Sequence, residues 1–301
     1  MPDVPDVKVV PPFPYGAPTW PKGVPRPPAE RHVGVDYDTA WARRYPVRLA
    51  RAVVLDGVTR PLVRTLASPT VEGLDRLRAV TGPVVFAPNH ASHVDTPLVL
   101  TSLPERLRHR TAVAAGADYF FDKRWKAALS AFAIGAIPIE RIRVSPQSTR
   151  LAAGLIADGW SLVIFPEGGR SVDGWGRAHR AGAAYLALRT GVPVVPVHLE
   201  GTRRIQKRGA KGVRSASTRV SFGPPLRADR DEDARAFAVR VERAIAVLAD
   251  EANSGYWQAR RRAAAGATPA LVGPVAAPWR RNWALGEGKR RTDGTPRWPT
   301  R

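Results

Sequence analysis

The sequence predicts an α/β fold with a mostly parallel central sheet flanked by helices and preceded by an N-terminal amphipathic helical region. From residue 82 to residue 199, short apolar runs rich in Val, Ile and Phe alternate with longer helical patterns, which is typical of a parallel sheet covered by helices. Three of the apolar runs end abruptly in polar residues, at His90, Glu140 and Glu167. Since the carboxyl ends of parallel strands meet at one edge of a sheet, we expect a functional site there.

The composition limits the size, the chemistry and the partners that the protein can have. The chain has 301 residues, enough for one domain of about 200 residues or more with extensions. It has no cysteine, which excludes disulfides, thiolate metal ligands and a cysteine nucleophile. The net charge of +21 favours anionic partners, whether nucleic acid, anionic lipid or a phosphorylated substrate. We expect neither a secretory signal nor a membrane-spanning segment, because no window has an uninterrupted apolar run of the required length.

Two segments precede the alternating part. Residues 1–35 are rich in Pro and predict an extended arm. Residues 36–68 place Arg among Val and Leu in a basic amphipathic pattern that is broken near Gly57 and Pro61. This pattern fits a helical pair lying on an anionic membrane surface, and it fits equally a pair of helices packed on the core.

The α/β domain is expected over residues 69–255, and residues 71–77 predict either a short strand or the start of a helix. Short runs of β-branched and aromatic residues predict strands at residues 84–86, 111–115, 136–141, 161–166, 194–199 and 218–222.

The expected helices lie between these strands. Ser145 followed by Pro146 is a typical helix start, and Gly191 is a typical residue just past a helix end. Acidic residues followed by a spaced apolar stripe indicate the last helix. The predicted ranges are residues 95–103, 123–132, 145–157, 176–189 and 231–252.

Basic residues crowd two parts of the second half of the chain. Residues 203–214 predict a basic loop, and residues 256–301 form a tail in which four Trp residues stand among Arg, Pro and Gly. We expect this tail to be weakly ordered or wrapped on the domain. Its composition also suits an interface with lipid headgroups or nucleic acid.

His90 and Asp95 form the first candidate site. On one regular helix, five positions correspond to about 140° of rotation, so the two side chains would point apart. They meet only if His90 lies in the turn after the strand and Asp95 lies in the first helical turn. The carboxylate then holds one ring nitrogen and leaves the other free as a general base. A structural His beside a helix-capping Asp is the alternative from this stretch alone.

Other candidates for the same edge follow the third and fourth strands. Gly168 and Gly169 allow close approach of a ligand to the backbone. Arg141 and Arg170 suit bidentate capture of a phosphate. A polar loop with Gly and Arg is, taken singly, more often just a turn, but the convergence of several such loops favours a site.

Four blocks in this order resemble those of the glycerolipid acyltransferases of the 1-acyl-sn-glycerol-3-phosphate acyltransferase (lysophosphatidic acid acyltransferase, PlsC-like) type. They are residues 89–95 (Asn-His-Ala-Ser-His-Val-Asp), 135–141 (Gly-Ala-Ile-Pro-Ile-Glu-Arg), 165–171 (Phe-Pro-Glu-Gly-Gly-Arg-Ser) and 192–198 (Val-Pro-Val-Val-Pro-Val-His). The resemblance covers roughly residues 70–225. It departs from the family at Gly169, where the family usually has Thr or Ser, so one side-chain hydroxyl is lost.

The resemblance implies transfer of a fatty acyl group from acyl-CoA or acyl-carrier protein to a hydroxyl of lysophosphatidic acid in phospholipid biosynthesis. His90 would deprotonate that hydroxyl for direct attack on the thioester, and Asp95 would fix the tautomer of His90. No cofactor and no metal are expected. The implied location is peripheral, on the cytoplasmic face of the cell membrane, in contact with its anionic surface.

The remaining family positions are expected to bind substrate. Arg141 and Arg170 would hold the phosphate of the acceptor, with Gly168 close by. Glu167 would shape its loop or bind an acceptor hydroxyl.

Three alternatives stay open. Glycerol 3-phosphate, another lysolipid, a lipoamino acid or a glycolipid would also fit as the acceptor. A zinc hydrolase is disfavoured because Thr96 and Pro97, not a further His, follow Asp95. A basic nucleic-acid-binding protein accounts for the charge and the scattered Trp residues, but the basic residues are spread widely and no nucleic-acid module is recognisable, so no nucleic acid is expected as a partner.

Overall fold

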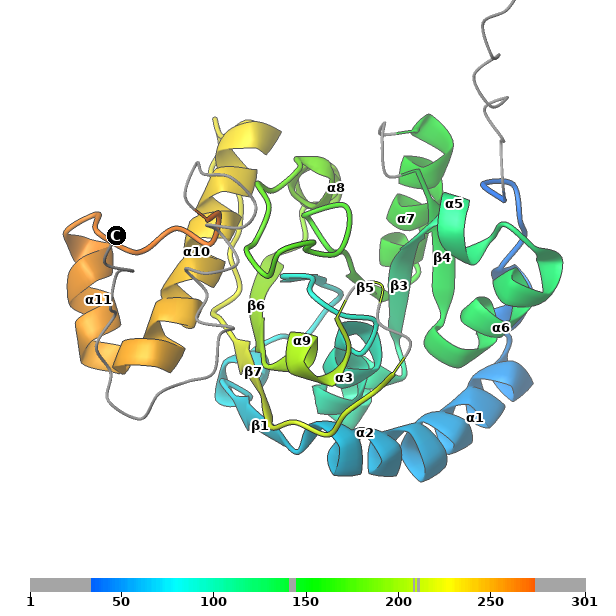
Figure 1. Ribbon diagram of the computed structural model, residues 1–301. Helices are drawn as coiled ribbons and strands as arrows, with labels where there is room; N and C mark the ends of the chain where they lie inside the picture. The colour runs from blue at the N-terminus through cyan, green and yellow to red at the C-terminus, as the bar shows by residue number, and fades with distance from the viewer. Residues whose placement is uncertain (1–33, 141–144, 208, 210–211, 274–301) are drawn as a thin grey trace, which may run out of the picture. The chain divides into compact units, whose positions relative to one another are not determined.

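The computed structural model describes residues 34–140, 145–207, 209 and 212–273. Within them, one seven-stranded sheet has the strand order β1–β7–β6–β2–β5–β3–β4 (Figure 1). Every neighbouring pair is parallel except β6 and β7, which are antiparallel. The predicted α/β class with a mostly parallel sheet is therefore confirmed. The strands are β1 (Pro69–Glu72), β2 (Val85–Pro88), β3 (Thr111–Gly116), β4 (Ala136–Ile139), β5 (Ser161–Val163), β6 (Val194–Glu200) and β7 (Thr218–Phe222).

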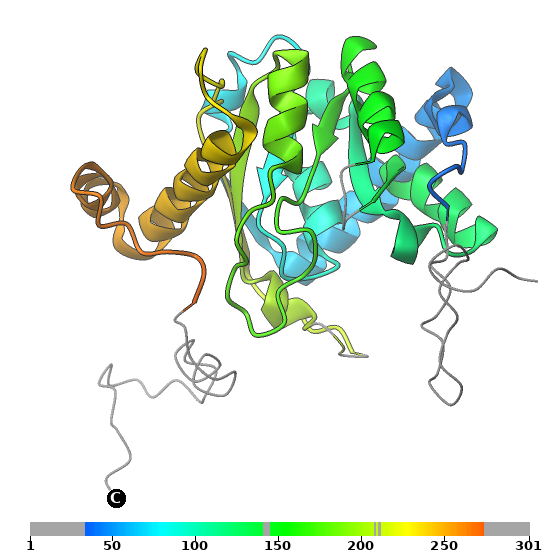
Figure 2. The ribbon, with the colours of Figure 1, turned by 90° about the horizontal axis from the view of Figure 1, so that it is seen from above.

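Helices cover both faces of this sheet, as Figures 1 and 2 show. On one face, α7 (Pro146–Ala157), α8 (Gly182–Thr190) and α10 (Ala234–Ser254) share a buried cluster with β2, β5 and β6. On the other face, α3 (Asp95–Ser102) and the N-terminal helices bury a second cluster. The central strands are buried on both sides, which explains why their sequences are continuous apolar runs instead of alternating ones. Further helices of the domain are α4 (Glu105–Arg108), α5 (Ala117–Phe120), α6 (Arg124–Ile134) and α9 (Thr202–Ile205).

The N-terminal helical region is one curved, uninterrupted run and not a pair broken near Gly57. It consists of α1 (Tyr45–Val54), one turn of π-helix (Leu55–Thr59) and α2 (Arg60–Ala67). Pro61 lacks a backbone N–H, and it stands at the start of α2 just after the π-helical turn, where the α-helical hydrogen-bond pattern is already altered. No helix in the described part of the chain is long and apolar enough to cross a bilayer.

One predicted helix is corrected. The helix expected over residues 176–189 begins only at Gly182. The backbone amides of Arg177 and Arg180 donate instead to the loop after β5, so this segment cannot close helical turns. The sequence showed the apolar pattern but not these competing hydrogen bonds.

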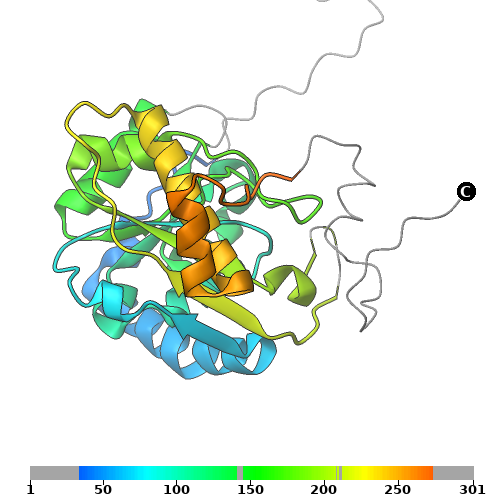
Figure 3. The same ribbon diagram turned by 90° about the vertical axis from the view of Figure 1, so that its left-hand side faces the viewer.

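The C-terminal tail is more ordered near its start than expected. Residues Tyr256–Ala264 form α11, which packs beside α10 (Figure 3). An ion pair joins the two helices, in which Nε and Nη2 of Arg262 donate to the carboxylate of Asp250 at 2.7 and 2.5 Å. The chain then crosses the domain as far as Gly273, and the amide of Gly176 donates to the carbonyl of Leu271 at 3.0 Å. The three later Trp residues of the tail, like most of the predicted Pro-rich arm, lie outside the described residues.

Candidate active site

His90 and Asp95 meet as the spacing requires. β2 ends at Pro88, His90 follows in the turn, and Asp95 is the first residue of α3. The ring nitrogen Nδ1 of His90 lies 2.8 Å from Oδ2 of Asp95. Asp95 is fully buried, and the same Oδ2 accepts the backbone amides of Ala91 at 2.7 Å and Ser92 at 2.8 Å. The carboxylate is therefore held by the backbone while it orients the imidazole, which leaves Nε2 as the ring nitrogen that can exchange a proton.

Phe165 fixes the plane of that imidazole. It follows β5, and its ring stacks on His90 with centroids 4.0 Å apart and planes inclined by 28°. No role was predicted for Phe165, although it stands in the third of the four blocks.

Glu167 joins the two loops that carry the site. It is buried, its Oε1 accepts the backbone amide of His90 at 2.8 Å, and its Oε2 accepts the backbone amide of Arg177 at 3.0 Å. Burial raises the pKa of Glu167 to about 7, and the two backbone hydrogen bonds oppose that rise. Glu167 is not among the residues that line the cavity. Of its two predicted roles, this position favours the shaping of the loops.

A cavity of about 1020 Å³ opens beside His90 at the carboxyl edge of the strands. One wall is basic, with Arg170, Arg177 and Arg180 among its residues. Another wall is apolar and comes from β3, β4, the end of β5 and the neighbouring helices. Its members are Val113, Ala114, Ala115, Phe120, Ile134, Ile139 and Ile164.

Gly168 lies where the backbone meets the basic wall. It has a φ of +68°, and a Cβ atom at this position would lie 2.8 Å from Nε of Arg180. Only glycine fits both requirements. Arg177 and Arg180 were missed by the sequence reasoning because they fell inside the helix expected from residue 176. Arg141, the other predicted phosphate ligand, lies outside the described residues, directly after the cavity-lining Glu140.

His93 also lines the cavity. Its ring stacks on Tyr119 with centroids 5.5 Å apart, and its Nε2 lies 3.2 Å from the Tyr119 hydroxyl. Burial, and then the charge of Arg170, lower the pKa of His93. Among the residues that the structure describes, no three His, Asp or Glu side chains are grouped as a metal site would require.

These groups define the chemistry that the cavity can support. A hydroxyl bound next to His90 can lose its proton to the ring as it attacks an electrophile. Arginines suit a phosphate or another planar anion. The apolar wall suits a hydrocarbon chain, because its burial removes apolar surface from water.

Comparisons with known proteins agree with the resemblance to the glycerolipid acyltransferases. Residues 68–200 match the model of the Acyltransferase family. The chain is 30% identical over 159 residues to the chloroplastic 1-acyl-sn-glycerol-3-phosphate acyltransferase BAT2 of Brassica napus, covering 52% of this chain and 44% of that protein. It is also 30% identical over 159 residues to the chloroplastic 1-acyl-sn-glycerol-3-phosphate acyltransferase LPAT1 of Arabidopsis thaliana, covering 52% and 43%. The chain thus spans less than half the length of these two relatives.

A solved structure has the same fold. The crystal structure of the 1-acyl-sn-glycerophosphate (LPA) acyltransferase PlsC from Thermotoga maritima matches with a TM-score of 0.56 and 20% identity, covering 73% of this chain and 85% of that one. At this identity the likeness establishes the fold. Together, the family model and the relatives confirm the resemblance that the four sequence blocks predicted.

Proposed function

We propose that this chain, whose residues 68–200 match the Acyltransferase family model, transfers a fatty acyl group from a thioester to the free hydroxyl of lysophosphatidic acid in phospholipid biosynthesis. One observation carries the proposal. The His90–Asp95 pair, with 2.8 Å between Nδ1 and Oδ2, stands at a cavity that has both a basic and an apolar wall. A lysophospholipid acceptor and a fatty acyl donor need all three features.

The reaction follows from the pair. Nε2 of His90 takes the proton of the acceptor hydroxyl while the oxygen attacks the thioester carbonyl, so the C–O bond forms without an acyl-enzyme. The C–S bond then breaks, and the imidazolium returns the proton to the leaving thiolate. Asp95 stabilises the imidazolium between these steps. The donor is acyl-CoA or acyl-carrier protein, whose thioesters are chemically equivalent at the reacting carbon.

The acceptor phosphate is assigned to the basic wall. Arg170 is the family position, and Arg177 and Arg180 add two guanidinium groups beside it. Gly168 brings the backbone close to the same place. Arg141 stays a predicted phosphate ligand, from the segment directly after β4.

A membrane contact is proposed for the outer face of the α1–α2 run. This face carries a stripe of apolar side chains that are each more than half exposed, namely Tyr45, Leu49, Val53, Val58 and Leu62. Successive members of the stripe are four residues apart, except that five residues separate Val53 in α1 from Val58 in the π-helical turn. The wider turn of the π-helix takes up the extra residue, so the stripe stays on one side of the run. An exposed apolar stripe of this length fits the boundary region of a bilayer.

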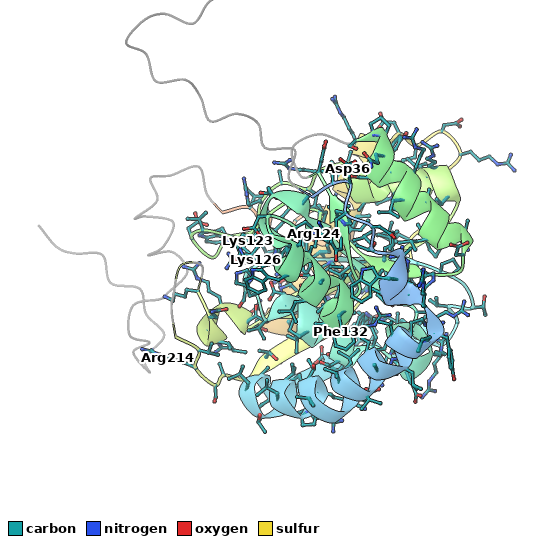
Figure 4. All side chains as sticks on the ribbon, turned by 90° about the vertical axis from the view of Figure 1, so that its right-hand side faces the viewer. Asp36, Lys123, Arg124, Lys126, Phe132 and Arg214 are labelled. Atoms are coloured by element: carbon teal, nitrogen blue, oxygen red, sulfur yellow. The ribbon has the colours of Figure 1, made fainter. Side chains whose placement is uncertain are left out.

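The beginning of α6 extends this contact. Trp125 and Leu129 are more than half exposed, and Figure 4 shows Lys123, Arg124 and Lys126 around the same end of the helix. Aromatic and basic side chains are favoured at the headgroup level of anionic bilayers. Since the cavity-lining residues 119–120 directly precede this segment, the contact would set the cavity beside the lipid. We therefore propose a peripheral location, on the cytoplasmic face of the cell membrane.

Turnover assays test the reaction. The wild type, His90→Ala and the control His109→Ala would receive palmitoyl- or oleoyl-CoA with either lysophosphatidic acid or glycerol 3-phosphate, and products would be read by mass spectrometry. We expect turnover with lysophosphatidic acid and a loss of about a thousandfold in His90→Ala only. Turnover with glycerol 3-phosphate alone would favour that acceptor, and an active His90→Ala would contradict the general-base role.

A further inference from the structure

A second cavity, of about 720 Å³, lies between α2, β1 and the segment from the end of α3 to α4. Its lining includes Pro69 of β1 and Ser102 at the end of α3. None of its lining residues lines the active-site cavity. The two cavities are therefore separate, and the groups assigned to acyl transfer take no part in the second one.

Three arginines and one carboxylate line the second cavity: Arg60, Arg64, Arg108 and Glu105. Arg108 is buried, donates to the carbonyl of Leu103 at 3.0 Å and pairs with Asp56 at 3.1 Å. In the described part of the chain, no carboxylate lies within ion-pair distance of Arg60 or Arg64. Burial lowers the pKa of Arg108, the charges of Asp56 and Glu105 oppose this shift, and the charges of Arg60 and Arg64 add to it. The cavity thus carries an excess of positive charge that its own residues leave uncompensated.

Ser102 gives an independent sign of a ligand. The residue is only 9% exposed, and its hydroxyl oxygen is buried without a hydrogen-bond partner among the described residues. Buried hydroxyls in folded proteins are nearly always paired. Ser102, Arg60 and Arg64 line the same cavity, and a hydroxyl together with guanidinium groups is a donor set that phosphate oxygens accept.

We propose that this cavity binds a phosphate group through the guanidinium forks of Arg60 and Arg64 and the hydroxyl of Ser102. The phosphate has two possible sources. One is the headgroup of a bilayer phospholipid, because Leu62 of the same helix belongs to the exposed apolar stripe. The other is a soluble phosphate compound. In either case the site binds a ligand away from the reacting atoms and goes beyond the proposed acyl transfer.

Vesicle binding tests the lipid source. The full-length wild type, the double variant Arg60→Lys/Arg64→Lys and the control Arg230→Lys/Arg235→Lys would be sedimented with vesicles of phosphatidylglycerol and phosphatidylcholine. The lysines keep the charge but lose the bidentate geometry, so a lipid phosphate in the cavity predicts binding about tenfold weaker in the first double variant and unchanged in the control. Ser102→Ala, which changes no charge, should weaken binding in the same direction.

Calorimetry with inorganic phosphate tests the soluble source. We expect the wild type to bind phosphate at one site that is absent from Arg60→Lys/Arg64→Lys. If that variant and Ser102→Ala match the wild type in both the vesicle and the phosphate experiments, the proposal is wrong. Turnover of lysophosphatidic acid below its micelle concentration should be unchanged in these variants, so failure here is distinguishable from failure of the proposed reaction. Circular dichroism would verify that each variant is folded.

Discussion

Helices α1 and α10 are both amphipathic, but α1 buries its basic face and α10 buries its apolar face. α10 buries its apolar stripe, including Phe237, Val241 and Ile245, in the core, as its sequence pattern predicts. α1 exposes Leu49 and Val53 and turns its arginines inward. The inward face of α1 packs through cations and the outward face is apolar, which is the reverse of an ordinary surface helix.

One aromatic side chain accounts for the inward arginines. The guanidinium groups of Arg48 and Arg51 lie 5.2 and 5.8 Å from the ring centre of Trp160. Arg51 is 6% exposed, and burial, followed by repulsion from Arg48, lowers its pKa to about 10. It is still charged at neutral pH. Periodicity thus identifies an amphipathic helix, but it does not tell which face meets the protein.

The largest predicted effect is on the free energy of unfolding, when a carboxylate is placed on the apolar face of each helix. Ile245→Asp in α10 buries an unpaired carboxylate, so we expect it to lower the free energy of unfolding by more than about 4 kcal/mol. Leu49→Asp in α1 should change it by less than about 0.5 kcal/mol, since the side chain already faces outward. Urea denaturation would measure both. Equal destabilisation by the two variants would mean that the stripe of α1 is buried against protein.

Deleting residues 45–68 tests the proposed membrane contact less cleanly than a single substitution does, although the basic amphipathic pattern of this segment first suggests the deletion. Val63 and Ala67 of this segment belong to the buried cluster beneath the sheet. A deletion would therefore remove part of the core along with the outer stripe.

A second comparison concerns buried charge: Arg51 keeps its charge at neutral pH, whereas Glu167 titrates near it. The raised pKa of Glu167, about 7 against an ordinary 4.5, means that the folded state binds the proton more tightly. Its contribution to stability is fully present below pH 4.5 and is lost as the pH rises through about 7, by up to about 3 kcal/mol. Urea denaturation of the wild type and Glu167→Gln across this range should show that pH-dependent loss in the wild type only. Parallel curves would place the pKa of Glu167 near its ordinary value.

The buried charge of Arg51 predicts a smaller effect of opposite sign. Arg51→Met keeps the length of the side chain and removes a buried cation that has no carboxylate partner among the described residues. We expect the free energy of unfolding to rise by about 1 kcal/mol. The exposed Arg235 of α10 is the control, since Arg235→Met should change stability by less than about 0.5 kcal/mol. Destabilisation by Arg51→Met would show that the contact with Trp160 outweighs the desolvation of the charge.

In the candidate site, too, some residues are placed by local sequence pattern and others by tertiary contacts. The sequence predicted the edge of the sheet, the meeting of His90 with Asp95 and the nearness of Gly168 and Arg170, because each follows directly from a strand end and a turn. It did not predict Arg177 and Arg180. Their place depends on hydrogen bonds between two loops that are ten or more positions apart in the chain, and no local periodicity encodes such bonds.

A last prediction separates the two helices by function instead of stability. Val53 in α1 and Val239 in α10 are the same residue type and similarly exposed, at 65% and 57%. Replacing either by Asp should leave the fold intact. If the outer face of α1 contacts lipid, Val53→Asp should weaken sedimentation with phosphatidylglycerol vesicles about tenfold, because it places a carboxylate in the boundary region of an anionic bilayer. Val239→Asp adds the same charge on the opposite layer of the sheet and should bind as the wild type does. Equal weakening by both variants would mean that net charge alone governs binding, and the exposed stripe of α1 would then need another partner.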